Sequence, residues 1–427
     1  MQNIRVELED LSAVKKKLDI SVPAETVRKE ISAAYQSLRS NASIAGFRKG
    51  AAPLNILKAR FGSDIQEDVT KRLIESTYPQ ALGEKKLIPV EAPKVELKAD
   101  KAREDQDFSY SVTFEVQPRV EIDGYMGMEL KKEDVTVTDQ DIDTGIENLR
   151  QASAQFKDVE RPAKEGDLVV VDFEAFIGGE PIKNGKGADY PCIIGERTML
   201  PGFDEALKGA TKGPKEIDLN FPENYSEATI AGKTGHFKLT VKAVKEKSVP
   251  DLTEDFAKDV GCENLDALRA KVKEEIERHK SNEAKERLKN DILTMLIDKH
   301  QFEVPQALVN RYMGIILNRI IDNMRMGSFA PEDKGLNVDQ LKEKYTPAAV
   351  RSVKEDIVLD YIAAKEKVDA SEQDVESAVR NIAAQRQVSY ESLMARIEKE
   401  GALEVIKDGL KHEKVFDIII GSSKTAA

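Results

Sequence analysis

The sequence predicts a multidomain protein of the α+β class. We expect an N-terminal α+β domain, a β-rich middle domain and an all-α C-terminal domain with helical arms. A chain of 427 residues exceeds what one hydrophobic core organises, which indicates several domains. Alternating apolar and polar residues near the N-terminus and a glycine-dense middle segment indicate strands, whereas apolar stripes at helical spacing continue from Pro250 to the end.

The N-terminal domain is expected to span residues 1–117. Residues 4–8 and 15–22 alternate between apolar and polar side chains and predict two strands. Pro23 then begins a helix, because proline is favoured in the first helical turn. The apolar stripe of this helix consists of Val27, Ile31, Ala34, Tyr35 and Leu38.

A second helical region and a third strand complete this domain. Pro53 starts a short helix that Gly62 is expected to close, and residues 64–78 continue in a helical pattern. Aromatic side chains recur on one side of residues 108–116, which predicts a strand with a period of two. The helical pattern of residues 64–78 places on one face Ile65, Val69 and Leu73.

Beyond residue 117 the pattern changes twice. Residues 118–154 are expected to be a connector, part extended and part helical. Residues 155–246 form the β-rich domain, in which Gly178 and Gly179 make a hairpin turn. The pattern of residues 247–427 predicts helices whose narrow apolar stripes are flanked by many charged residues. One of these helices, within residues 304–326, is expected to bury Leu308, Tyr312, Ile315, Ile316 and Ile320.

Composition and charge exclude several classes of protein. The net charge is −12, which disfavours binding of nucleic acid over the whole surface. Residues 1–100 nevertheless carry 17 Lys and Arg against 14 Asp and Glu, so RNA would be approached through this part. We find neither a signal peptide nor an apolar run of membrane-spanning length, so no membrane partner is expected. The two cysteines, Cys192 and Cys262, suggest a reducing compartment, and we expect a cytoplasmic location.

The sequence offers no centre for metal or covalent chemistry. The four histidines are scattered and show no zinc-ligand spacing with the cysteines. Phosphate-binding and nucleophile motifs of the GxxxxGK[ST] and GxSxG types are absent from the sequence. We therefore expect no metal and no cofactor.

One segment still points to catalysis. Residues 166–247 resemble the FKBP class of peptidyl-prolyl isomerases, through "VDFEAFIGGEPI", "IIGERTMLPGFDEALKGA", "FPENYSE" and "HFKLTVKAV". The resemblance implies an apolar cavity that favours the twisted X–Pro amide without a nucleophile or a general base. By position, the residues that would line this cavity are Phe173, Ile182, Tyr190, Met199, Leu200, Phe203, Tyr225 and Phe237.

This resemblance has two departures and one competing interpretation. Phe203 stands where the family usually has a tryptophan in the pocket floor, and Lys183 stands where it usually has an acidic residue. The competing interpretation is that the same apolar residues only form the core of a small β-barrel.

A loop near the N-terminus, "SIAGFRKGAAP" at residues 43–53, does not look like a core segment or an ordinary turn. With the "PLNILKARFG" helix after it, and with "LTEDFAKDVG" and "FEVPQALV" further on, the whole chain resembles the trigger factor family of bacterial ribosome-associated chaperones. The resemblance implies that the loop docks on the large ribosomal subunit near the exit tunnel, against protein and rRNA. The docking residues would be Gly46, Phe47, Arg48, Lys49 and Gly50.

The same resemblance implies that the helical half holds nascent and unfolded polypeptides. Methionines provide adaptable contacts for such clients, although they also fill gaps between helices. Other interpretations stay open: a stand-alone isomerase whose helical half dimerises it, an RNA-binding factor, or a loop in which Phe47 folds back onto its own helices. Whether the chain forms a homodimer off the ribosome is also open. The methionines that would make such contacts are Met295, Met313, Met324 and Met326.

Overall fold

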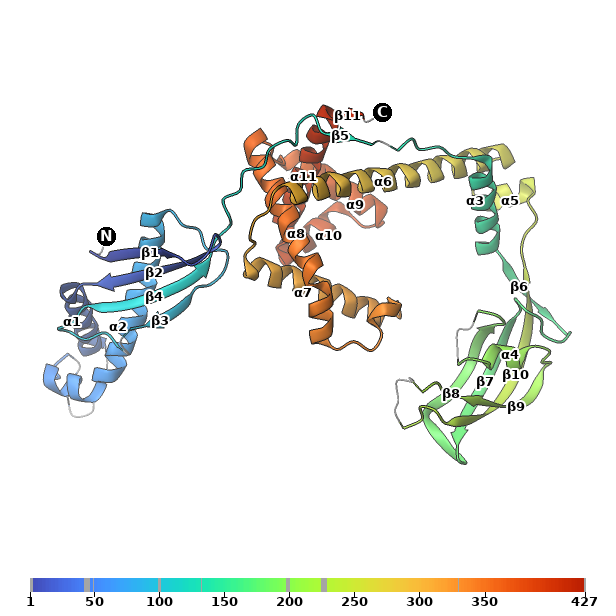
Figure 1. The fold of residues 1–427 in the computed structure, drawn as a ribbon. Helices are drawn as coiled ribbons and strands as arrows, with labels where there is room; N and C mark the ends of the chain where they lie inside the picture. Colours follow the sequence, from blue (N-terminus) through green and yellow to red (C-terminus); the bar gives the residue numbers. More distant parts are fainter. Residues whose placement is uncertain are drawn as a thin grey trace. The chain divides into compact units, whose positions relative to one another are not determined.

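The computed structural model divides the chain into two compact units, residues Met1–Lys132 with Arg287–Ala427, and residues Glu133–Glu286 (Figure 1). The structure describes residues 3–41, 47–48, 50–98, 101–131, 133–196, 200–223, 229–328 and 330–425. The side chains of residues 183, 184 and 425 are not described.

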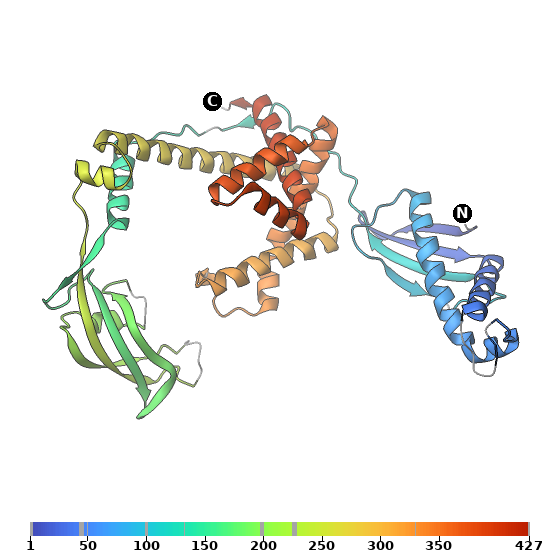
Figure 2. The same cartoon turned by 180° about the vertical axis from the view of Figure 1, so that it is seen from behind.

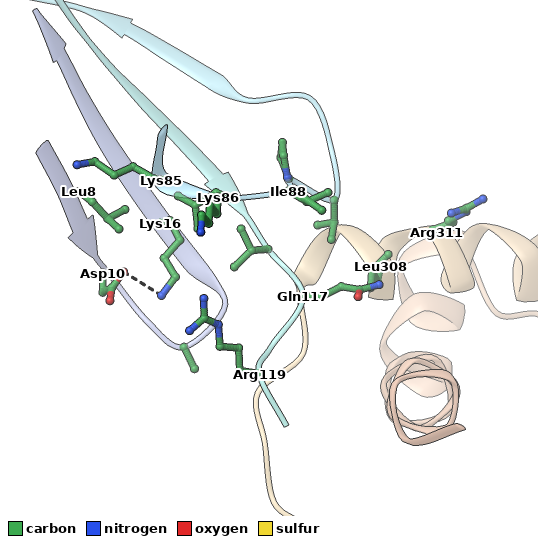
Figure 3. Close-up of a pocket in the computed structure, with 15 residues that line it drawn as sticks. Leu8, Asp10, Lys16, Lys85, Lys86, Ile88, Gln117, Arg119, Leu308 and Arg311 are labelled. Carbon is green, nitrogen blue, oxygen red and sulfur yellow. Dashed lines mark ion pairs between the residues drawn. The ribbon is translucent and has the colours of Figure 1, made fainter. Parts of the chain in front are cut away.

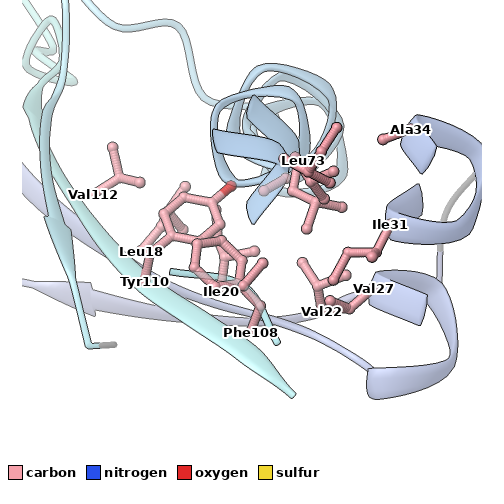
Figure 4. Close-up of a cluster of buried hydrophobic side chains, with 14 of the residues drawn as sticks. Leu18, Ile20, Val22, Val27, Ile31, Ala34, Leu73, Phe108, Tyr110 and Val112 are labelled. Atoms are coloured by element: carbon pink, nitrogen blue, oxygen red, sulfur yellow. The ribbon is translucent and has the colours of Figure 1, made fainter. Parts of the chain in front are cut away.

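The first unit begins with an antiparallel sheet in the order β1-β2-β4-β3, with two helices packed against it (Figures 1 and 2). The predicted strands are confirmed: in β2 the alternate residues Leu18, Ile20 and Val22 are buried, as the period of two requires. These side chains meet residues of both helices and of β4 in one core (Figure 4). The elements are β1 (Arg5–Asp10), β2 (Lys15–Val22), α1 (Ala24–Asn41), α2 (Leu54–Lys85), β3 (Lys94–Leu97) and β4 (Phe108–Glu115).

The prediction that Gly62 closes a short helix is wrong. Helix α2 passes through Gly62 and is 32 residues long in total. A glycine inside a helix costs only about 1 kcal/mol relative to alanine, and α2 buries Leu57, Ile65 and Leu73 along its length. Gly62 also lies close to α1, because a Cβ atom there would be 3.5 Å from the Tyr35 hydroxyl oxygen. The continuous buried face therefore outweighs the local preference to stop.

The second part of this unit is helical, as predicted. Residues Ile292, Ile362 and Ile419, from three different helices, are completely buried in one cluster. The connector joins this cluster through Ile122 and Leu130. The elements are α6 (Leu265–Lys299), which begins in the second unit, α7 (Gln306–Arg325), η1 (Pro331–Asp333), α8 (Val338–Glu366), α9 (Glu372–Gln385), α10 (Tyr390–Glu400), α11 (Leu403–Ser422), and the short parallel pair β5 (Glu129–Leu130) and β11 (Lys424–Thr425).

The apolar face predicted for residues 304–326 needs a correction. Helix α7 buries Val309 and Met313 against α8, whereas the side chain of Ile315 is 50% exposed. Leu308, Tyr312 and Ile316 of the predicted stripe do pack against this core, so the correction concerns Ile315, and the position of α8 centres the buried face on Val309 and Met313. Met313 is consequently a core residue, while Met295 and Met326 are exposed.

The second unit contains the sheet β6-β10-β7-β8, with β9 paired to β10. The predicted hairpin turn is confirmed, since Gly178 and Gly179 link β7 to β8 with φ values of +61° and +89°, a conformation that glycine adopts without steric cost. The elements are α3 (Asp139–Ala152), β6 (Gln155–Val159), β7 (Leu168–Ile177), β8 (Glu180–Ile193), α4 (Phe203–Leu207), β9 (Gly213–Asn220), β10 (Thr234–Ser248) and α5 (Glu254–Asp259).

Candidate functional site

Four aromatic side chains from four elements of the second unit meet in one cluster. The centroid of the Phe173 ring in β7 lies 5.7 Å from the ring centroid of Tyr190 in β8 and 6.1 Å from that of Phe203 in α4. The ring of Phe237 in β10 lies 6.0 Å from that of Phe203 at an angle of 77°. These edge-to-face contacts are the arrangement that aromatic rings prefer.

Burial is graded across this cluster. Phe203 is completely buried and forms its floor together with Phe237. Phe173 and Tyr190 are only half-buried, and they pack against the same core from its outer side. The half-buried members leave part of the apolar cluster accessible to solvent, and they include Ile182 and Leu200.

The structure therefore brings together six of the eight residues predicted to line the cavity. Met199 and Tyr225 lie outside the described residues, and the side chain of Lys183 is not described. Sequence reasoning missed Phe221, whose ring is buried and lies 6.1 Å from that of Phe237. The available signal was the period of two along β9, because Phe221 continues the alternation that buries Leu219.

Two glycines allow the backbone to approach these rings. Gly187 pairs directly with Phe173 across β7 and β8, and a Cβ atom at Gly187 would lie 2.5 Å from the Phe173 ring. A Cβ atom at Gly235 would lie 2.6 Å from the Phe221 ring. Since Cβ atoms essentially never come within 3 Å of another heavy atom, any side chain at either position would displace a ring.

The floor of the cluster is held in place by polar contacts around α4. Gly202 precedes the helix with a φ of +87°, which turns the chain so that Phe203 points inward. The buried carboxylate of Asp204 accepts a hydrogen bond from the Gly195 backbone N–H at 2.9 Å. The Lys215 ammonium donates to the Ala206 carbonyl oxygen at 2.5 Å. These contacts explain how a helix of five residues keeps a fixed position.

A charged group near this cluster, the Asp172 carboxylate, already has hydrogen-bonding partners within the protein. The Asp172 carboxylate accepts hydrogen bonds from the Lys242 ammonium and from the Asp189 backbone N–H. The hydrogen bond from Lys242 is the main cause that lowers the pKa of Asp172. Among the described residues, no group of three or more His, Cys, Asp and Glu side chains is placed to hold a metal ion. The arrangement suits catalysis by desolvation and shape better than proton transfer.

A partly buried ion pair links the segment between β6 and β7 to β10. Both carboxylate oxygens of Asp167 accept hydrogen bonds from the Arg161 guanidinium, at 2.6 and 3.0 Å. Arg161 also pairs with Glu246 of β10 at 2.8 Å. The hydrogen bonds from Arg161 are the main cause that lowers the pKa of Asp167 below its ordinary value of 3.8. The ionised form of Asp167 therefore stabilises the folded unit.

Replacing Asp167 by asparagine is expected to lower the melting temperature of this unit by about 3–6 °C at pH 7. A folded-state pKa below the unfolded one means that the stabilisation is present above pH 4 and lost as the pH falls towards the folded pKa. The wild type should therefore lose stability as the pH falls below about 4, and the variant should lose less. Calorimetry measures both changes. The control is Asp158→Asn, an exposed carboxylate 3.9 Å from Lys245 in the same unit; an equal effect of both substitutions would contradict the assignment.

A second candidate site is the loop between α1 and α2. Phe47 is 39% exposed, which disfavours the interpretation that it folds back onto its own helices. Gly50 has a φ of +84° and makes a turn in which the Ala51 N–H donates to the Arg48 carbonyl oxygen at 2.9 Å. Gly46 and Lys49 lie outside the described residues.

The start of α2 extends this exposed apolar surface along the chain. Leu54 and Ile56 are 48% and 40% exposed in the first turn of the helix. Arg39 of α1 donates to the Gly50 carbonyl oxygen at 3.0 Å and ties the loop to the preceding helix. Sequence reasoning placed these two apolar residues in a helix without recognising that they face solvent.

Comparison with known proteins matches three segments of the chain, which together cover most of it, to the domains of one class of chaperone. Family models described as "Bacterial trigger factor protein (TF)", its C-terminus, and "FKBP-type peptidyl-prolyl cis-trans isomerase" match residues 4–149, 264–421 and 159–242. These three matches define a chaperone that carries an FKBP-type peptidyl-prolyl isomerase domain.

Individual relatives agree over the full length. The chain is 33% identical to the trigger factor of Geotalea uraniireducens over 99% of this chain and 98% of that one. It is 32% identical to the trigger factor of a Geobacter species, over 96% and 99% of the two chains. A solved trigger factor chaperone has the same fold, with a TM-score of 0.51 and 23% identity, over 97% of this chain and 99% of that one.

The chain belongs to the trigger factor family. The predicted multidomain α+β fold is confirmed, and so are the predicted chaperone class and its isomerase domain. None of the helices in the described residues combines the length and the apolar character that crossing a membrane demands.

Proposed function

We propose that this protein is a cytoplasmic chaperone that docks on the large ribosomal subunit near the exit tunnel and holds nascent polypeptides there. Its contacts on the ribosome are with protein and with rRNA. The observation that supports this most strongly is the exposed Phe47 on a turn whose Gly50 has a left-handed backbone. Family membership supports the same function.

The loop has the chemistry that such docking requires. An exposed aromatic ring can enter a pocket of a partner protein, which is the usual role of an anchor residue. Arg48, which is exposed, and Lys49 can pair with rRNA phosphates or acidic side chains. Gly46 and Gly50 allow the chain to turn on either side of this tip. We therefore assign the docking role to residues 46–50, with Leu54 and Ile56 extending the contact.

The aromatic cluster is proposed to catalyse prolyl isomerisation. Rotation about a peptide bond has a barrier of roughly 18–20 kcal/mol, because rotation breaks the conjugation of the planar amide. Hydration favours the planar, charge-separated form and so supports this barrier. The half-buried rings of Phe173 and Tyr190 above the Phe203–Phe237 floor would remove water and fit the twisted amide. We assign Ile182, Met199, Leu200 and Tyr225 to the same wall.

The helical part is proposed to hold clients through separate apolar side chains among charges. Ile315, Met295 and Met326 are exposed on helices α6 and α7 or directly after them. Isolated apolar groups of this kind bind many sequences weakly, because none of them forms a selective pocket. Met324 contributes to a cavity of about 400 Å³ together with Ile316 and Ile320.

These roles divide the chain into a ribosome-binding domain at residues 1–117, a connector at 118–154, an isomerase domain at 155–246 and a chaperone domain at 247–427. We propose that the helical domain also permits a homodimer off the ribosome. Sedimentation analysis of the purified chain measures this, since a dimer must dissociate on dilution.

The test of the proposed function uses the unmodified full chain in three assays. It should pellet with ribosomes, suppress the aggregation of a chemically unfolded protein, and accelerate the isomerisation of a prolyl peptide. Acceleration alone, without ribosome binding or suppression of aggregation, would instead support a stand-alone isomerase. Binding to naked rRNA as tight as binding to whole ribosomes would favour an RNA-binding factor.

A further inference from the structure

A cleft of about 870 Å³ opens at one end of the sheet in the first unit (Figure 3). Its position follows from the length of α2. Leu8 of β1 pairs in register with Leu18 of β2, whose side chain is completely buried. Paired residues lie on the same face of a sheet, so Leu8 points to the face that α2 covers. Because α2 ends at Lys85, Leu8 stays 42% exposed.

The side chains around this cleft are mostly positive. The cations are Lys16, Lys85, Lys86, Arg119 and Arg311, against one acidic residue, Asp10. Lys16 pairs with Asp10 at 2.9 Å, and Lys85 pairs with Glu84 at 3.3 Å. Lys86, Arg119 and Arg311 form no ion pair within the part of the chain that the structure describes.

Apolar side chains lie between these cations. Ile88 is 83% exposed, although it lines the same cleft as Leu8. Val90 and Val116 contribute further apolar surface. Lysines at the C-terminal end of a helix can be explained by the helix dipole alone, which accounts for Lys85 and Lys86. That explanation does not extend to Arg119, which lies outside α2, or to the exposure of Ile88 and Leu8.

We propose that this cleft binds extended, acidic segments of unfolded polypeptides that have apolar residues between their carboxylates. The proposal rests on the chaperone function proposed above and names one class of client segment for it. A polypeptide of this kind matches both features of the cleft, because its carboxylates pair with Lys86 and Arg119 and its apolar side chains cover Ile88 and Leu8. A nucleic acid would match the charge and leave the apolar side chains uncovered.

The test measures the binding of a fluorescein-labelled peptide of alternating glutamate and leucine residues to the full chain by anisotropy. Binding to the wild type should weaken as salt rises. The double variant Lys86→Glu, Arg119→Glu should weaken binding about tenfold or more, because two attractive contacts become repulsive. Ile88→Ser should also weaken it, and a substitution at so exposed a position leaves the fold intact.

The charge-matched control is Lys71→Glu, Lys94→Glu, two exposed cations of the same domain outside the cleft. Equal weakening by this control would overturn the proposal, and so would tighter binding of an RNA oligonucleotide that the cleft variants abolish. The aggregation assay separates the two levels of inference. If the wild type suppresses aggregation but the cleft variants bind the peptide with the affinity of the wild type, only the assignment of the cleft fails. If the wild type does not suppress aggregation, the proposed function itself fails.

Discussion

Replacing Phe203 by alanine is expected to reduce kcat/KM for a prolyl peptide by at least about tenfold, which corresponds to about 1.4 kcal/mol of lost transition-state stabilisation. The ring of Phe203 is completely buried. Its centroid lies 6.1 Å from the centroid of the Phe173 ring and 6.0 Å from that of the Phe237 ring. Removing it leaves a hole under the rings that would face the twisted amide. A protease-coupled or NMR exchange assay of isomerisation measures the loss.

Alanine at a buried position also destabilises the unit, since loss of a buried phenylalanine typically costs about 3–5 kcal/mol. Phe203→Leu keeps more of the packing and should still reduce turnover, because the aromatic surface is lost. The matched control is Phe176→Leu, whose ring lies under the Lys238 ammonium and outside the buried cluster. If Phe203→Leu retained full turnover while Phe176→Leu did not, the cluster would be the core of the barrel and not the catalytic surface.

Replacing Phe47, Arg48 and Lys49 together by alanine is expected to weaken ribosome binding by at least about a hundredfold. An aromatic anchor alone contributes about 2–4 kcal/mol at a well-packed contact, and two cations add to this. Because Phe47 is exposed and contributes little to the core, its replacement should leave the fold of the domain intact. Co-sedimentation with ribosomes at several protein concentrations measures the change in affinity.

The control for the loop removes the same kinds of side chain elsewhere in the domain. The control variant combines Leu97→Ala, Arg28→Ala and Lys29→Ala. It removes one exposed apolar side chain of β3 and two exposed cationic side chains of α1. This variant should bind ribosomes like the wild type, and both variants should keep full isomerase activity because the aromatic cluster proposed to catalyse isomerisation lies in the other unit. Unchanged sedimentation of the loop variant would remove the docking role from residues 46–50.

The sequence by itself determined the elements whose pattern is local. The alternation of apolar residues placed β2 and β4 within a residue of their observed bounds. The spacing of Val27, Ile31 and Tyr35 selected the buried face of α1 correctly. The resemblance of the middle segment to the FKBP class identified six side chains that meet in the structure, four of them aromatic, because each has a fixed position within the matching segment.

Only the tertiary structure decided features that depend on partners distant in the chain. The sequence spacing could not show that α8 would bury Val309 and Met313 and leave Ile315 in solvent. Neither could it show that Gly187 lies opposite Phe173, or that the connector joins a helical core through Ile122 and Leu130. Local pattern records which residues prefer burial, whereas the particular surface that buries them is chosen by the free energy of packing against another element. The cleft beside Leu8 has the same origin, because its walls come from β1, the C-terminal end of α2, the segment after β4 and helix α7.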